Sequence, residues 1–293
     1  MMRVLLFGAN GQVGRETVAL AAERGLDLVA LDRAGADICD PAAIARAIES
    51  ARPDAVINAA AYTAVDKAES EPEAAARVNG RAPGLIAERC AHAGVPFLHI
   101  STDYVFDGTK TGPYVESDPV APLGVYGRTK AAGEAAVRAA HADHIILRTA
   151  WVYGVHGGNF LKTMLRLARE RDRLTVVADQ RGCPTATRDI AEALLAAAAA
   201  AKAGTARFGT FHFAGTGTTT WHGFASEIVR QAARHTGRTP EVAAITTADY
   251  PTPARRPANS ELESRLFEQA YGVRAMPWQT RTAEVVDALL KTT

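Results

Sequence analysis

A glycine-rich turn near the start of the chain constrains the fold more than any other feature. The run from Met2 to Gly14 reads MRVLLFGANGQVG, in which an apolar segment predicts a buried strand and the residues after the turn predict a helix. Gly8, Gly11 and Gly14 permit a tight turn, a close approach of backbone to phosphate, and close packing of the helix on the strand. The pattern therefore predicts a pyrophosphate site, with a purely structural turn as the alternative.

The residues after the turn extend this site toward a ribose. The N–H groups of Gln12 and Val13 are expected to face the anion together with the positive end of the helix dipole. Asp32 and Arg33 end the second predicted strand about twenty residues later. A carboxylate there accepts from the ribose 2′-OH of NAD and a guanidinium pairs with the 2′-phosphate of NADP, so we expect both NADH and NADPH unless the two residues are only a solvated pair. The next loop adds two residues expected to flank the adenine, Asp37 and Ile38.

Charge and cysteine content exclude several classes of protein. Lys and Arg number 33 against 32 Asp and Glu, so we expect neither nucleic acid nor an anionic membrane surface as a partner. The chain opens on strand residues without an apolar leader, which favours a cytoplasmic location. The alanine-rich segment 191–203 is too short to cross a bilayer and predicts a solvent-backed helix. The cysteines are too widely spaced for a zinc site or a disulfide framework, and they are Cys39, Cys90 and Cys183.

Strand-like and helical segments alternate along the chain, so the central sheet is expected to be mostly parallel. Right-handed crossovers would wind it into a Rossmann-type, doubly wound α/β fold. We expect a dinucleotide-binding domain over residues 1–150 and a smaller, mostly C-terminal substrate-binding part over 151–293, with segments near 174–215 returning to the first domain. The predicted strands are Arg3–Phe7, Leu26–Leu31, Ala55–Asn58, Phe97–Ser101, Ile145–Arg148, Thr175–Ala178 and Thr210–Phe213.

Two further patterns carry chemistry. Ser101 and Thr102 lie at the carboxyl end of a central strand and point to opposite faces, so their spacing does not say which of them meets a ligand. Tyr126 and Lys130 form a YxxxK motif at the opening of a predicted helix and share one face. The ammonium is expected to lower the pKa of the phenol and to hold a nicotinamide ribose, while the phenol donates a proton to a carbonyl oxygen. Alone, such a motif is most often accidental. It predicts a catalytic pair here because a glycine turn and a strand end with Ser and Thr precede it.

An ordered series of motifs gives a family resemblance over nearly the whole chain. The motifs are GANGQVG at 8–14, NAAAYTAVDKAESEPE at 58–73, STDYVFDG at 101–108, VYGRTK at 125–130, RTAWVY at 148–153, NFLKTMLRLA at 159–168, DQRGCPT at 179–185, TTTWH at 218–222 and YPTPARRPANS at 250–260. With them the chain resembles the extended short-chain dehydrogenase/reductases, and among these the reductases of a thymidine-linked keto sugar. The resemblance implies NAD(P)H-dependent reduction of the 4-keto group of dTDP-6-deoxy-L-lyxo-4-hexulose to dTDP-L-rhamnose.

The same resemblance implies roles for individual residues. Ser101 would be a bystander, and Trp151 of the sugar pocket is as readily a core indole. The implied catalytic set is Thr102, Tyr126 and Lys130. The residues implied near the substrate are Asp103, Tyr104, Trp151, Arg256 and Asn259. Those implied around the cofactor are Gly11, Gln12, Val13, Asp37, Ala60, Ala61 and Thr63, where small side chains would let the backbone lie against a flat ligand.

Two departures from the family pattern bear on metal and loop structure. Some members bridge a homodimer through magnesium held by glutamates. Glu16 is present here, but Arg188 stands where a glutamate is expected, so we expect no metal and leave a homodimer open. Gly124 replaces an asparagine before VYG, which would loosen the catalytic loop without removing a chemical group.

Two rival functions remain on the sequence. The first is a nucleotide-sugar dehydratase or epimerase on the same scaffold, against which Tyr104 stands where dehydratases have a glutamate after Asp103. The second is a non-catalytic NADP-binding subunit that resembles the regulatory subunit of methionine adenosyltransferase. The intact set of Thr102, Tyr126 and Lys130 favours an enzyme.

Overall fold

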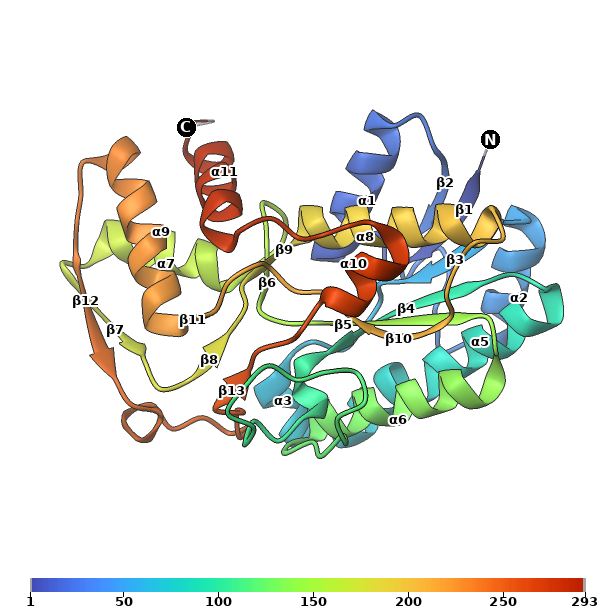
Figure 1. Ribbon diagram of the computed structural model, residues 1–293, viewed down its shortest axis with the longest axis horizontal. Coiled ribbons are helices and arrows are strands. Elements are labelled where there is room, and N and C mark those ends of the chain that lie inside the picture. Colours follow the sequence, from blue (N-terminus) through green and yellow to red (C-terminus); the bar gives the residue numbers. More distant parts are fainter. Residues whose placement is uncertain (1, 292–293) are drawn as a thin grey trace.

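A six-stranded parallel sheet forms the centre of the molecule in the computed structural model, which describes residues 2–291 (Figure 1). The strand order is β10-β5-β4-β3-β1-β2, and all neighbouring pairs are parallel. The strands are β1 (Arg3–Phe7), β2 (Asp27–Leu31), β3 (Ala55–Asn58), β4 (Phe97–Thr102), β5 (His144–Thr149) and β10 (Gly209–His212). The prediction of a mostly parallel, Rossmann-type sheet is therefore confirmed.

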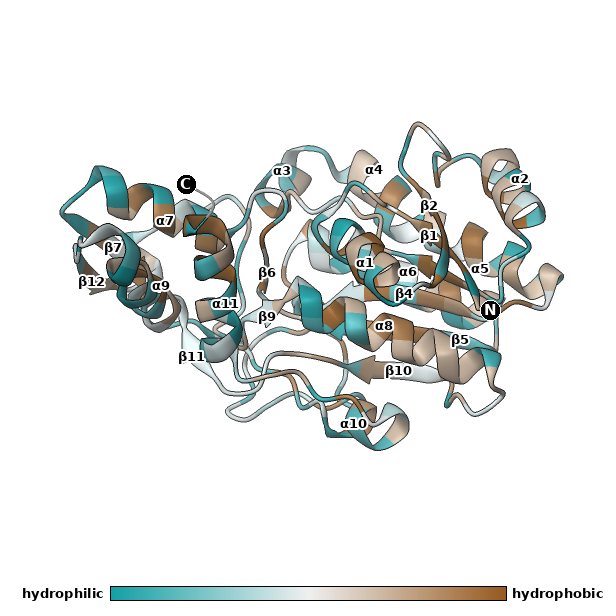
Figure 2. Ribbon diagram, turned by 90° about the horizontal axis from the view of Figure 1, so that it is seen from above, coloured by the Kyte–Doolittle hydropathy of each residue, from teal (hydrophilic) through white to brown (hydrophobic). Residues whose placement is uncertain are grey.

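Helices cover both faces of this sheet, which explains why its strands are almost continuously apolar. Val4 and Leu5 point to opposite faces of β1, and both are fully buried. Figure 2 shows brown, hydrophobic strands enclosed between the helices. One face carries α1 (Gln12–Glu23), α8 (Thr187–Lys202) and α10 (Arg265–Tyr271), and the other carries α2 (Pro41–Ala51), α5 (Ala82–Ala93) and α6 (Val125–Ala140).

The chain reverses its direction of winding at the centre of the sheet. From β1 it crosses to β2 at one edge, then returns to β3 on the other side of β1. In open α/β sheets such a reversal leaves a crevice at the carboxyl ends of the two strands. Beyond β3 lie α3 (Val65–Ser70), α4 (Pro72–Ala75), a π-helix (Ala76–Arg81) and, after β4, a 3₁₀ turn (Asp103–Val105).

A second group of elements packs beside the sheet, at the left of Figure 1. The strand expected at Thr175–Ala178 forms as β7 but pairs with β12 outside the central sheet. The reason is its alternating exposure, which suits a small sheet with one wet face. This group contains α7 (Phe160–Glu170), β7 (Arg173–Val177), α9 (Trp221–Thr236), β12 (Glu241–Ile245), a 3₁₀ turn (Thr247–Asp249) and α11 (Trp278–Leu290).

Short strand pairs join the two groups of elements. They are β6 (Val152–Tyr153) with β9 (Thr185–Ala186), and β8 (Arg181–Gly182) between β11 (Thr219–Thr220) and β13 (Asn259–Ser260). Segment 187–212 packs on the central sheet through α8 and β10, whereas β7 does not. The domain boundary near residue 150 stays a prediction. Within residues 2–291, none of the helices has the length and hydropathy that a bilayer crossing requires.

Candidate active site

A cleft of about 780 Å³ runs along the carboxyl ends of the central strands, from the glycine turn to the start of α6. Its wall contains nearly all residues predicted to hold a cofactor, and Gly14 is the exception. The predicted residues that line it are Gly8, Gly11, Gln12, Val13, Asp32, Arg33, Asp37, Ile38, Ala60, Ala61, Thr63, Tyr126 and Lys130. The cleft thus brings together residues up to 150 positions apart, from Gly8 to Gly158, and its size suits a small-molecule ligand.

Each of the three positions in the turn requires a glycine for a different structural reason. Gly8 has φ +86°, and a Cβ there would lie 2.5 Å from the amide nitrogen of Ala60. A Cβ on Gly14 would lie 2.1 Å from the carbonyl oxygen of Gly8, so Gly14 lets α1 pack against the strand and does not face the cleft. Gly11 precedes α1 without a side chain to cap it, and the first turn holds no acidic residue. The N-terminus of α1 is therefore suited to bind an anion.

At the far end of the cleft, the Asp32 carboxylate is engaged within the protein. Its Oδ2 accepts from Nδ2 of Asn10 at 2.6 Å, and its Oδ1 accepts from the N–H groups of Ala34 and Gly35 at 3.0 and 2.9 Å. Arg33 is 83 % exposed, and its Nε lies 3.5 Å from Asp37. A guanidinium this loosely held can turn toward a phosphate, whereas the Asp32 carboxylate has little free capacity for a ribose hydroxyl.

Tyr126 and Lys130 lie on the first turns of α6 at the other end of the cleft. Lys130 is 2 % exposed, and its Nζ donates to the carbonyl of Ile100 at 2.6 Å. Loss of water around each group raises the pKa of Tyr126 to about 12 and lowers the pKa of Lys130 to about 8. Lys130 is not among the groups that shift the pKa of Tyr126, so the expected lowering of this pKa by the lysine is not seen here, and desolvation is the largest cause of its rise.

The two hydroxyls that spacing left undecided have different hydrogen-bond partners. Ser101 donates to Oε1 of Glu134 at 2.6 Å, so its proton is already used on a buried carboxylate. Thr102 also donates to a buried carboxylate, Oδ1 of Asp103 at 3.0 Å, and it lies close enough to Tyr126 to lower the pKa of that phenol. That Thr102 is the hydroxyl that acts with Tyr126 stays a prediction.

None of the residues predicted near the substrate is in the lining of this cleft, but Asp103 and Tyr104 contact Thr102 and Tyr126. Asp103 is 2 % exposed, burial raises its pKa to about 6, and its Oδ2 has no hydrogen-bond partner among the described residues. Tyr104 packs edge-on against Tyr126 with ring centroids 5.5 Å apart. An unpartnered buried carboxyl oxygen next to the phenol is suited to a polar ligand.

Trp151 has two unusual features. Its indole stacks on that of Trp221 with centroids 3.6 Å apart, and its φ is +47°, which is strained for a residue with a side chain. A Cβ on Gly182 would lie 2.5 Å from the same indole. Trp151 is 8 % exposed, so in this structure it is mainly a core residue beside the site.

Arg256 and Asn259 have internal partners. Arg256 forms a two-pronged ion pair with Asp66 on α3, both distances being 2.7 Å. Asn259 donates to the carbonyls of Lys110 and Gly112 at 2.8 and 2.9 Å, which uses both of its N–H donors. These two residues fix loops around the site.

Several cleft residues were missed from the sequence. Asn10 lies inside the glycine turn and holds Asp32, and Tyr62 lies beside the predicted alanines. Gly157 has φ +64°, and a Cβ there would lie 2.9 Å from the Gln12 side chain. The glycines at 154, 157 and 158 are typical of a loop, but the return of this loop over the turn depends on tertiary structure. The other unpredicted lining residues include Cys39, Glu71, Arg77, Ile100, Thr149, Val152 and Gly158.

The departure at Gly124 is compensated from another helix. Gly124 has no side chain to cap α6, and Oε1 of Glu69 on α3 accepts from the N–H of Val125 at 2.7 Å. A Cβ on Gly124 would lie 2.6 Å from that Glu69 oxygen. The glycine therefore makes room for a cap on the helix that carries Tyr126 and Lys130, while the expected loosening of the loop stays a prediction.

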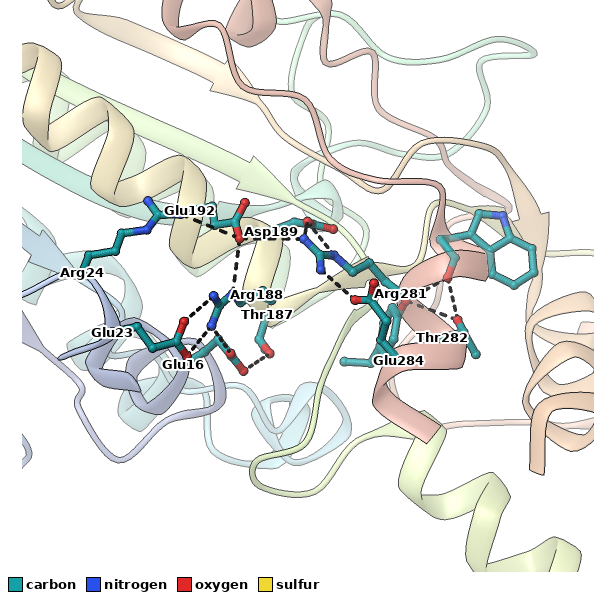
Figure 3. Close-up of polar contacts among 12 residues, drawn as sticks. Glu16, Glu23, Arg24, Thr187, Arg188, Asp189, Glu192, Arg281, Thr282 and Glu284 are labelled. Atoms are coloured by element: carbon teal, nitrogen blue, oxygen red, sulfur yellow. Dashed lines mark hydrogen bonds and ion pairs between the residues drawn. The ribbon is translucent and has the colours of Figure 1, made fainter. Parts of the chain in front are cut away.

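The departure at Arg188 places a cation among the acidic residues (Figure 3). The guanidinium lies 2.6 Å from Glu23, 3.2 Å from Glu192 and 3.8 Å from Glu16. A metal ion at this position would have to displace it, so these residues do not fit a cation site. Across residues 2–291, no group of three or more His, Cys, Asp or Glu side chains is arranged to hold a metal.

The sheet, the glycine turn and the Tyr126–Lys130 pair define the class of the molecule, a Rossmann-type short-chain dehydrogenase/reductase. A family model described as "RmlD substrate binding domain" matches residues 2–291. The dTDP-4-dehydrorhamnose reductase of Burkholderia thailandensis is 45 % identical and aligns over 99 % of each chain. The chain therefore belongs to the dTDP-4-dehydrorhamnose reductase family, which confirms the resemblance seen in the motifs.

Solved structures from the same family agree with this assignment. A dTDP-4-dehydrorhamnose reductase from Clostridium acetobutylicum has a TM-score of 0.91 at 38 % identity, with 98 % of this chain and 99 % of that chain covered. The enzyme from Bacillus anthracis, in complex with NADP, has a TM-score of 0.89 at 32 % identity, with 97 % and 99 % covered.

Proposed function

We propose that this protein catalyses the NAD(P)H-dependent reduction of the 4-keto group of dTDP-6-deoxy-L-lyxo-4-hexulose to dTDP-L-rhamnose. The observation that carries the proposal is that Tyr126 and Lys130 line one end of a cleft that begins at the glycine turn, with Thr102 close enough to Tyr126 to lower its pKa. The relatives named above are reductases of this substrate, and one of them was solved with NADP. Family membership and site chemistry thus support the same reaction.

The residues divide the work of such a reduction. Bound NADPH would supply the hydride for the ketone carbon, and the glycine turn with the start of α1 would hold its diphosphate. Tyr126 would donate its phenolic proton to the ketone oxygen, and its raised pKa keeps the phenol protonated at neutral pH. Thr102, beside Tyr126, would orient the same ketone oxygen, and Lys130 would hold the nicotinamide ribose.

The substrate would lie beyond Tyr126, against Asp103, Tyr104 and the edge of Trp151. Arg256 and Asn259 would act there by holding their loops, because their polar groups are bonded within the protein. A division near residue 150 between a cofactor part and a substrate part fits this arrangement.

The rival functions make different demands on the same residues. Elimination of water by a dehydratase would need a second acid next to Asp103, where this chain has Tyr104. A purely regulatory NADP-binding subunit would not need Thr102 beside Tyr126. Both rivals would leave the 4-keto sugar nucleotide unreduced in the presence of NADPH.

The test is turnover of the purified protein with NADPH and the 4-keto sugar nucleotide, followed by product analysis. We expect dTDP-L-rhamnose, and a loss of about 100-fold or more in kcat for Tyr126→Phe with cofactor affinity little changed, because the variant lacks only the proton donor. Tyr271→Phe is the matched control, since that phenol lies on α10 and donates to the carbonyl of Arg207. A different sugar epimer, or near-normal turnover by Tyr126→Phe, would refute the proposal.

A further inference from the structure

A chain of buried polar side chains runs behind the cleft from β3 through β4 to α6. Its members are Asn58 and His99, both fully buried, and Lys130, which is 2 % exposed. Nδ2 of Asn58 lies 3.2 Å from Nδ1 of His99, and Nε2 of His99 lies 3.3 Å from Nζ of Lys130. The catalytic roles proposed above use Lys130 but assign nothing to the other two.

The backbone fixes the direction of this chain. The N–H of Ala60 donates to Oδ1 of Asn58 at 3.0 Å. If the Asn58 amide were rotated by 180°, its NH₂ group would face this N–H, and two donors would oppose each other. Nδ2 of Asn58 therefore donates toward His99, whose Nδ1 must accept. A neutral imidazole that accepts at Nδ1 carries its proton on Nε2.

The proton on Nε2 of His99 points at Lys130. A neutral amine can accept this N–H, because it has a lone pair. An ammonium has only donors, so a charged Lys130 would set donor against donor at 3.3 Å. To remove the conflict, His99 would have to move its proton to Nδ1 and lose its bond with Asn58.

We propose that His99 is a positioning residue for Lys130, which favours the neutral form of the amine in the free protein and makes its protonation depend on the His99 tautomer. The inference rests on the proposed function, because it concerns how Lys130 is prepared for the cofactor. It also gives the buried Asn58 a role, that of fixing the tautomer from β3.

The other charged and titratable groups near Lys130 do not replace His99. Glu134 on the next turn of α6 raises the pKa of Lys130, but its carboxylate pairs with Arg148 at 2.7 Å and accepts from Ser101. From β4, Lys130 meets the carbonyl of Ile100 besides His99. Tyr126 stays protonated near neutral pH. Burial lowers the pKa of Lys130 to about 8, which is the same direction as the effect proposed for His99.

Cofactor binding as a function of pH tests the inference without turnover. NADH is the probe, because it lacks the 2′-phosphate that titrates in NADPH, and its affinity is measured by fluorescence from pH 6.5 to 9.5. If the ammonium binds more tightly, affinity falls as Lys130 loses its proton, and the midpoint reports that ionisation. Lys130→Met should abolish the titration.

His99→Gln is the decisive variant, because its side-chain oxygen can accept from a charged lysine. We expect the midpoint to rise by about one pH unit, because the hydrogen bond from this position would stabilise the ammonium in place of the neutral amine. His99→Asn reproduces only Nδ1, so it removes the N–H that opposes the ammonium without supplying an acceptor and should raise the midpoint by less than His99→Gln. His144→Gln is the control, a like change at a buried histidine that bonds to the carbonyl of His141 at the other end of the sheet.

A second route covers the case in which His99→Gln fails to fold. Asn58→Asp is nearly isosteric, and its carboxylate would draw the His99 proton to Nδ1 and turn Nε2 into an acceptor, again raising the midpoint. If Lys130→Met abolishes the titration but neither variant moves it, His99 is only a core residue and the inference falls. If wild type shows no titration that depends on Lys130, the proposed role of Lys130 itself fails.

Discussion

At the scale of single residues, the glycine turn works because two of its positions leave no room for a Cβ atom. At Gly8 the obstacle is the backbone of Ala60, and at Gly14 it is the carbonyl of Gly8. Gly11 is different, because a Cβ there would lie 3.3 Å from the nearest atom. The absence of a side chain at Gly11 therefore matters more for the approach of a ligand than for the packing of the fold. Two of the glycines thus shape the protein and one shapes the cleft.

This distinction predicts unequal effects of alanine. Gly14→Ala must push α1 away from the turn, and we expect it to lower the free energy of unfolding by at least about 2 kcal/mol. Gly158→Ala, in the same cleft but with open space around it, should change it by less than about 0.5 kcal/mol. Urea unfolding measures both values, and equal effects would contradict the steric explanation.

A second prediction at this scale concerns cofactor choice. Arg33 is exposed and loosely paired, whereas Asp32 is held by Asn10, so Arg33→Ala should weaken NADPH binding about tenfold and leave NADH binding nearly unchanged. Arg46→Ala removes the same charge from α2, outside the cleft, and should alter neither affinity. If the ratio of the two dissociation constants does not change in Arg33→Ala, the guanidinium does not meet the 2′-phosphate.

The sequence located most of the cofactor cleft because those residues follow strands whose ends must meet. It did not locate the partners of Arg256 and Asn259, because Asp66 and Lys110 are about 150 or more residues away along the chain. The different partners of Ser101 and Thr102 also needed the structure, since Ser101 donates to Glu134 on α6 and Thr102 to Asp103.

At the scale of elements, the helix that carries Tyr126 and Lys130 depends on a cap from outside itself. The composition predicted a helix opening near YxxxK, and α6 begins at Val125. The sequence offers no cap at Gly124, and the carboxylate that replaces one comes from α3. Local patterns predict where a helix forms, but a cap from 56 residues away is visible only after folding.

Glu69→Ala should therefore affect both stability and turnover. It leaves the Val125 N–H without its partner and removes an anion from the helix N-terminus, so we expect a loss of about 1 kcal/mol in the free energy of unfolding and a lower kcat. Glu69→Gln keeps an acceptor for the Val125 N–H and should retain most of the stability and most of the kcat. Glu73→Ala, at an exposed carboxylate paired with Arg81, is the control. If Glu69→Ala changes stability and kcat no more than Glu73→Ala does, the cap does not position the helix that carries Tyr126 and Lys130.

At the scale of the whole molecule, one network of ion pairs connects three helices from distant parts of the chain (Figure 3). Arg188 on α8 reaches Glu23 on α1, while Arg281 on α11 reaches Asp189 on α8 at 2.7 Å. The start of α8 therefore joins the helix of the glycine turn to the last helix of the chain. The sequence marked Glu16 and Arg188 by comparison with a family pattern, but it could not show that Glu23 and Arg281 complete the set.

This network predicts that a chelator leaves activity and molecular mass unaltered, because Arg188 already neutralises the acidic residues.

Arg188→Glu should make this cluster able to bind a cation. It removes the cation, brings four carboxylates together with Glu16, Glu23 and Glu192, and should cost about 1 kcal/mol at low salt, a modest figure because the Glu23 side chain is 55 % exposed. Magnesium should then raise the Tm of the variant but not of the wild type, as measured by thermal unfolding with and without chelator. A wild-type Tm that rises with magnesium, or a mass by light scattering that falls in chelator, would show that a metal binds despite Arg188.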